Sequence, residues 1–220
     1  QAAHIPVHLG SMPESVAAAL KQFSLNEGDI VILNDPYLGG THLPDITLVA
    51  PVFAKSKQRK MLVGYVANRG HHADIGGMTP GSLPLSTDLH QEGLIIPPLL
   101  LAEKGKTNEA IVELLCRNSR TPTERRGDLD AQIAACRTGE IRLREIVERY
   151  GWADTRIHMH ALLEYSERLT RLAIRNIPDG TYEFHDFMDD DGISDEPVPI
   201  QVKVTVRDDE FTADFTGTSE

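Results

Sequence analysis

The sequence predicts an α+β fold with a mixed or antiparallel, β-rich N-terminal part, a central helical segment and C-terminal β-strands. Three observations support this prediction. Short runs of branched apolar residues dominate residues 1–107, helical periodicity dominates residues 108–178, and strand-like alternation returns in residues 179–220. Strands followed by helices and then by strands are typical of α+β proteins. We therefore divide the sequence into a β-rich metal-site region, a helical segment and a β-strand region at these boundaries.

The first region contains one helix and three strands. Residues 12–23 form a short amphipathic pattern, and Ser11 has the position and spacing of an N-cap. Residues 29–33 form a strand of branched side chains. Residues 46–53 and 61–67 form two more strands, which a basic seven-residue turn joins into a hairpin.

A long loop with many glycines and prolines covers residues 76–98. Loops of this length inside a compact domain usually have a function, often as a lid over a site. This loop carries Asp88, His90 and Glu92, and we expect His90 and Glu92 to close over a bound substrate.

The remaining elements follow from periodicity and from turn residues. The sequence predicts helices at 108–118, 123–150 and 156–176 and strands at 181–188, 197–207 and 210–215. Gly151 is the expected C-cap of the second of these helices.

Composition excludes several classes of protein. Twenty-two basic and 33 acidic residues give a net charge of −11, which argues against nucleic acid and anionic membranes as partners. No apolar run approaches the roughly 20 residues that span a bilayer. Cys116 and Cys136 lie in helical patterns without CxxC spacing, which predicts reduced thiols and a cytoplasmic location. The chain starts at Gln1 without Met and stops at Glu220, so we expect it to be a fragment of a longer polypeptide.

Two polar, glycine-rich loops flank the predicted hairpin, and each contains the pattern His-x-x-Asp. The pairs are His42 with Asp45 and His71 with Asp74. A hairpin centred between residues 56 and 57 would place His42 opposite His71, with Cα atoms about 5 Å apart. Imidazoles and a carboxylate from converging loops form open divalent-metal sites. The sequence therefore predicts such a site.

Other interpretations of these residues remain open. His42 and Asp45 could simply form an Asx-type turn that ends a strand. His72 follows His71 directly and should point the opposite way, toward substrate or behind the metal ligands. Asp74 could orient a ligand histidine, and either Asp74 or His72 could be the true ligand instead.

Further polar groups have plainer interpretations. Pro6 should prevent His4 and His8 from sharing a helix face, which makes them loop residues. The acidic run at 186–191 lacks the spacing of a calcium loop and is best explained as a solvated turn. The sequence has no GxGxxG, P-loop or Gly-x-Ser-x-Gly pattern.

Several segments together resemble the hydantoinase B/oxoprolinase family. They are QAAHIPVHLGSMPESV, GDIVILNDPYLGGTHLPDITLVAPVF, VANRGHHADIGGMTPGS, QEGLIIPP and GDLDAQIAAC. The family includes the B half of 5-oxoprolinase, N-methylhydantoinase, caprolactamase-type enzymes and a large subunit of acetone carboxylase. Its members are longer than this chain.

The resemblance implies hydrolysis of a cyclic amide such as a hydantoin, 5-oxoproline or a lactam. A hydantoinase A-type ATPase subunit or domain would use ATP to phosphorylate the amide, which implies a hetero-oligomer. The B part would hydrolyse the activated amide at a manganese or zinc centre. Matching the family motifs to this sequence gives His42, Asp45 and His71 as metal ligands, and a further acidic ligand of some relatives precedes Gln1.

The same resemblance leaves the catalytic roles as expectations. His72, Asp74 and Glu92 are the predicted catalytic residues, with proton transfer assigned to His72 or Asp74. An alternative reaction is the carboxylation of a ketone such as acetone, and a further alternative is a docking segment without catalysis.

Overall fold

The computed structural model describes residues 6–56, 59–81 and 84–219. These residues form two compact units, 1–152 and 153–220, which differ from the three regions marked by secondary structure along the sequence. The combination of helices with antiparallel sheets confirms the predicted α+β class.

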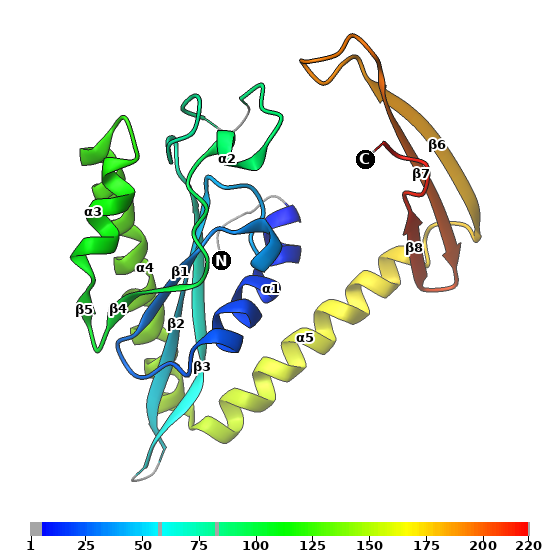
Figure 1. Ribbon diagram of the computed structural model, residues 1–220. Coiled ribbons are helices and arrows are strands. Elements are labelled where there is room, and N and C mark those ends of the chain that lie inside the picture. Colours follow the sequence, from blue (N-terminus) through cyan, green and yellow to red (C-terminus); the bar gives the residue numbers. More distant parts are fainter. Residues whose placement is uncertain (1–5, 57–58, 82–83, 220) are drawn as a thin grey trace. The chain divides into compact units, whose positions relative to one another are not determined.

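A five-stranded antiparallel sheet with the order β3-β2-β1-β4-β5 forms the centre of the first unit (Figure 1). Its strands are β1 (Ile30–Leu33), β2 (Asp45–Ser56), β3 (Arg59–His71), β4 (Leu99–Glu103) and β5 (Lys106–Thr107). The helices of this unit are α1 (Pro6–Gln22), η1 (Pro36–Leu38), α2 (Leu89–Glu92), α3 (Glu109–Arg117) and α4 (Pro122–Tyr150).

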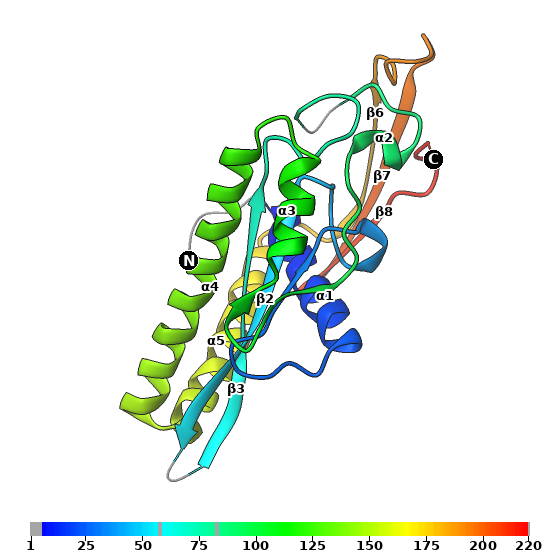
Figure 2. The same ribbon diagram turned by 60° about the vertical axis from the view of Figure 1, so that its left-hand side comes forward.

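Both faces of the sheet are covered, as the two views of Figures 1 and 2 show. Ile30 and Ile32 of β1 belong to a core cluster with Leu129 of α4, whereas Val31 and Leu33 belong to a cluster with Ala19 of α1. Successive side chains of a strand point to opposite faces. A strand with α4 on one side and α1 on the other is therefore apolar at every position, as the sequence IVIL is.

The second unit contains α5 (Trp152–Ile174, whose first residue lies in the first unit) and a three-stranded antiparallel sheet. Its strands are β6 (Gly180–Met188), β7 (Val198–Arg207) and β8 (Glu210–Asp214), in that order across the sheet. These bounds agree closely with the strands predicted from the sequence. Among the described residues, no helix combines the length and apolar character needed to cross a bilayer.

The hairpin differs from its prediction in register. Ser56 pairs with Arg59 and Asp45 pairs with His71, so the paired strands extend into the segment that the sequence predicts as a turn. The register also shifts between Val52 and Phe53. The predicted pairing of His42 with His71 was therefore wrong. The ladder is offset from the predicted one and the bulge adds to this offset, so His71 pairs with Asp45, three residues after His42.

The first helix begins earlier than the sequence predicted. Helix α1 starts at Pro6, runs through Pro13 and includes His8 and Ser11, so the prediction of Ser11 as an N-cap and of His8 as a loop residue was wrong. Proline is well tolerated at the first position of a helix, where its missing N–H would have had no partner. His4 lies outside the described residues.

Asn34, directly after β1, fastens the loop that follows it. Its side chain has no exposed surface and makes three hydrogen bonds to the main chain. The amide donates to the carbonyl oxygens of Leu43 (2.7 Å) and Leu94 (2.9 Å), and its oxygen accepts from the Ile96 N–H (2.6 Å). This one side chain therefore holds both ends of the loop between β1 and β2 against the segment before β4.

We predict that Asn34→Asp, which keeps the size of the side chain, lowers the free energy of unfolding by about 3 kcal/mol, because two buried carbonyl oxygens lose their donor and face a carboxylate. Urea denaturation measures the change. Asn176→Asp is the matched control, because the side chain of this exposed asparagine donates to the nearby carbonyl of Leu172 and not to a buried, distant segment. Equal stability of the Asn34 and Asn176 variants would contradict the prediction.

Candidate metal centre

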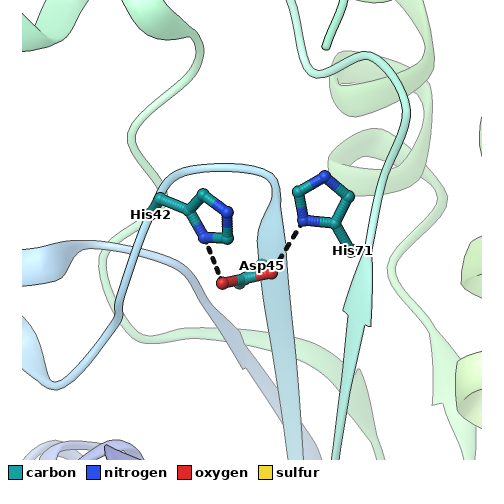
Figure 3. Close-up of side chains that lie close together, drawn as sticks. All are labelled: His42, Asp45 and His71. Carbon is teal, nitrogen blue, oxygen red and sulfur yellow. Dashed lines mark hydrogen bonds and ion pairs between the residues drawn. The ribbon is translucent and has the colours of Figure 1, made fainter. Parts of the chain in front are cut away.

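Three predicted ligands meet where the β2–β3 ladder ends (Figure 3). Asp45 is the first residue of β2 and pairs with His71, the last residue of β3. His42 precedes Asp45 by one turn, in the loop after η1, and its main-chain oxygen accepts from the Asp45 N–H at 2.9 Å. Strand pairing fixes two of the three residues, and the turn adds the third.

The carboxylate of Asp45 lies between the two imidazoles. His71 Nδ1 is 3.0 Å from Oδ1, and His42 Nδ1 contacts Oδ2. The centroids of the two rings are 4.9 Å apart. Two imidazoles at this separation are close enough to bind the same ion. The Asp45 side chain has no exposed surface, whereas those of His42 and His71 are 41% and 44% exposed. The site is therefore buried at the carboxylate and open at the imidazoles.

Surrounding donors keep Asp45 ionised. Burial by itself raises the pKa of this carboxyl, but the hydrogen bonds from Thr41 (Oγ1 to Oδ2, 2.6 Å) and His71 and the neighbouring imidazoles outweigh burial, so the pKa is lowered. An ionised carboxylate is the form that binds a cation.

The donor set fits a divalent ion of the zinc or manganese type. One ligand atom from each of His42, Asp45 and His71 lies within 4.8 Å of the other two. Two imidazoles and one carboxylate leave coordination positions for water or substrate, which is the arrangement of catalytic rather than structural metal sites.

The loop that carries His42 depends on a glycine. Gly39 has φ +88°, and a Cβ atom there would lie 2.5 Å from the carbonyl oxygen of Glu14 in α1. The Ser15 hydroxyl donates to the Gly39 carbonyl, which ties α1 to this loop. Only glycine allows the loop to pass this close to the helix with a left-handed backbone.

His72 points away from the cluster, as strand alternation predicts. It is 2% exposed, and its Nε2 lies 2.8 Å from Gln132 Oε1 in α4. Gln132 Nε2 donates in turn to the Ile46 carbonyl and to Asn68 Oδ1. Burial lowers the pKa of His72, so the neutral ring donates to the Gln132 oxygen. The structure thus gives His72 a contact that links β3 to α4, and its proton-transfer role remains a prediction.

Asp74 is buried in a different network. Its Oδ1 accepts from the Gly76 N–H (2.9 Å) and from Arg120 Nη1 (3.1 Å), and its Oδ2 accepts from the Arg120 N–H (2.6 Å). Arg120 also donates to the carbonyls of Gly77 and Met78. Asp74 therefore anchors the glycine-rich loop to the junction between α3 and α4, and it is not among the residues that the structure brings together with His42.

Glu92 ends the short helix α2, where its Oε1 accepts from the Ser86 hydroxyl at 3.2 Å. His90 is exposed and contacts Asp88 (2.7 Å). The structure gives neither residue a contact with the three-residue cluster in the described part of the chain, so their roles over a substrate remain predictions.

His8 is the residue of this site that sequence reasoning missed. Its Nδ1 is 3.6 Å from Asp45 Oδ2, and its ring lies 6.3 Å from that of His42. The sequence does contain a signal for it. Proline is favoured at the first position of a helix, and a helix that begins at Pro6 places His8 on its first turn.

The remaining candidates follow their plainer interpretations. In the acidic turn of the second unit, Asp190 and Asp191 accept hydrogen bonds from main-chain N–H groups within the turn. Cys116 and Cys136 are buried free thiols, as predicted, and burial raises the pKa of Cys136 to about 12.

Comparison with known proteins identifies relatives over the full length of the chain. The family model described as hydantoinase B/oxoprolinase matches residues 1–220. The chain is 38% identical to 5-oxoprolinase 1 of Arabidopsis thaliana over 249 residues, which cover 99% of this chain and 19% of that protein. It is 35% identical to the caprolactamase subunit beta of Pseudomonas jessenii over 213 residues, covering 96% of this chain and 36% of the subunit.

Two solved structures share the fold. The crystal structure of the ATP-dependent caprolactamase from Pseudomonas jessenii matches with a TM-score of 0.82 and 33% identity, over 95% of this chain and 36% of that one. A nucleotide-free acetone carboxylase structure matches with a TM-score of 0.73 and 20% identity, over 97% of this chain and 30% of that one. At 20% identity this second likeness shows the fold alone.

We predict that Asp74→Asn lowers the free energy of unfolding by about 2–3 kcal/mol at pH 7, because the amide nitrogen that replaces one carboxylate oxygen cannot accept a hydrogen bond from the N–H groups that face it. The folded pKa of Asp74 lies below its ordinary value of 3.8, so its ionised form stabilises the fold above that value. This contribution disappears as the pH falls through the lowered pKa.

The difference in stability between wild type and Asp74→Asn should therefore shrink toward zero as the pH falls below 3.8. Urea denaturation at several pH values measures it, with Asp195→Asn, at an exposed aspartate, as control. A difference that stays constant with pH would show that the charge of Asp74 does not stabilise the fold.

Proposed function

The chain belongs to the hydantoinase B/oxoprolinase family, and from this premise we propose that it carries the metal centre of an ATP-dependent cyclic-amide hydrolase. The proposed ligands are His42, Asp45 and His71. The observation that supports the proposal most strongly is the buried, ionised carboxylate with an imidazole nitrogen at each of its oxygens.

The whole reaction belongs to a longer protein than these residues. The chain spans 19% of the length of 5-oxoprolinase 1 and 36% of that of the caprolactamase subunit beta, so the substrates and partners below are proposed for the complete enzyme. Relatives named 5-oxoprolinase and caprolactamase suggest a cyclic amide as substrate, and the name subunit beta suggests a second subunit. We propose that this partner is a hydantoinase A-type ATPase, which consumes the ATP.

A divalent ion held by these residues would supply Lewis acidity toward the activated amide and would lower the pKa of a bound water. The residues of the chain provide the rest of the site. The Thr41 hydroxyl and the Asp45–His71 strand pair fix the carboxylate, so little reorganisation is needed when a cation binds. The partly exposed rings of His42 and His71 leave one side of the site open to substrate.

The positions of His72 and Asp74 support a positioning role in this proposal. His72 connects the end of β3 to α4, and Asp74 anchors the loop that follows His71. Both contacts hold the backbone around His71 in place. Residues that contact metal ligands without binding the metal commonly orient those ligands in this way.

We predict that the wild-type chain binds about one equivalent of Mn²⁺ or Zn²⁺, and that His42→Ala, His71→Ala and Asp45→Asn each weaken binding at least about tenfold, because each removes one of three ligand groups. Isothermal titration measures the affinity. His158→Ala, at an exposed histidine of the second unit, is the matched control. Metal content that is unchanged in all three variants would exclude this centre, as would a wild type that binds no metal, which is the behaviour of a docking segment.

We predict that in the complete enzyme, with its ATPase subunit and ATP, His71→Ala lowers the rate of ring opening about 100-fold or more, since several kcal/mol of transition-state stabilisation depend on the ion. Product formation is assayed on 5-oxoproline, hydantoins and lactams. Phosphorylation of the amide by the partner should continue. Ring opening at the wild-type rate would separate catalysis from this site.

A further inference from the structure

Helix α1 brings a third imidazole to the cluster. His8 Nδ1 lies 3.6 Å from Asp45 Oδ2, and the rings of His8 and His42 are inclined by only 27° with centroids 6.3 Å apart. The His8 Nδ1 atom is buried and has no hydrogen-bond partner among the described residues. A separation of 3.6 Å is too long for a hydrogen bond to the carboxylate. This nitrogen therefore faces the carboxylate at ion-pair distance without a hydrogen bond.

The separation between His8 and Asp45 suits two atoms that bind the same ion. His8 lies outside the group of ligand atoms within 4.8 Å of one another, so its ring must move toward the other two imidazoles when an ion binds. Donor atoms about 2.0–2.2 Å from one metal ion lie roughly 3.3–3.6 Å from one another where the angle between the two bonds is near tetrahedral, and a fifth position can still hold water. On the basis of the metal centre proposed above, we infer that His8 is a further ligand of that centre and binds the ion through Nδ1.

Helix α1 is held firmly enough to present a ligand. Ser11 and Ser15 follow His8 at intervals of three and seven residues, so the three side chains share one face of the helix. Arg69 of β3 donates to both serine hydroxyls, at 2.5 Å and 2.6 Å, and its Nε donates to Thr47 of β2 at 2.8 Å. The strands that carry Asp45 and His71 therefore also fix the helix that carries His8.

This ligand would change which metals the centre prefers. Three imidazoles and one carboxylate favour zinc, cobalt and iron over magnesium and calcium, which prefer sites made of oxygen donors. The proposal therefore predicts nitrogen-rich coordination for an ion placed here.

Cobalt(II) tests the proposal, because its visible absorption reports the number and type of its ligands. The chain is titrated with Co²⁺ as wild type, His8→Ala, His8→Gln, His42→Ala and the control His158→Ala. Circular dichroism verifies that each variant retains its helices. We expect both His8 variants to bind Co²⁺ about tenfold or more weakly, with an altered visible spectrum when saturated, while His158→Ala behaves as wild type.

The outcomes separate this inference from the proposed function. Wild-type affinity and spectrum in both His8 variants, together with lost binding in His42→Ala, would overturn the role of His8 and leave the metal centre intact. Weaker binding with an unchanged spectrum at saturation would also overturn it, because His8 would then act through Asp45. Absence of Co²⁺ binding in the wild type would overturn the metal centre itself.

Discussion

The candidate site depends on one buried carboxylate that stays ionised. Asp45 loses its hydration completely, and the hydrogen bonds from Thr41 and His71 more than compensate, so its pKa falls instead of rising. A buried charge of this kind is stable only where partners surround it. The partners here come from three separate segments, namely α1, the loop after η1 and the end of β3. The carboxylate of Asp45 can therefore stay buried and ionised only where the fold brings these three segments together around it.

The sequence predicted the identity of the cluster better than its geometry. His42, Asp45 and His71 were found from two His-x-x-Asp patterns at the ends of a hairpin, and the structure places their ligand atoms together. The register could not be derived by counting, because the bulge between Val52 and Phe53 has no signature in hydrophobic alternation. The wrong register nevertheless led to residues that the structure brings together, since loops at the end of a ladder converge over several positions.

His8 and the helix α5 show where pattern reasoning fails. From the sequence alone Pro6 predicts a break, but in the structure it opens α1, so His8 lies in a helix and not in the predicted loop. In α5 the leucine periodicity predicted the helix correctly but not its burial. Leu162, Leu163 and Leu172 are 64%, 69% and 54% exposed. Periodicity reports which face of a helix is apolar, and only tertiary structure decides whether anything covers that face.

The adjacent histidines of the second motif show how one strand end serves two purposes. Alternation along β3 turns His71 toward Asp45 and His72 toward Gln132 of α4. Gln132 also donates to the Ile46 carbonyl of β2, one residue from Asp45. The amide of a single α4 side chain thus bonds to both strands at the point where they carry Asp45 and His71. A metal site on loops alone would need to order them on binding, whereas a site fixed at a paired strand end, braced from behind by a helix, has most of that ordering completed during folding.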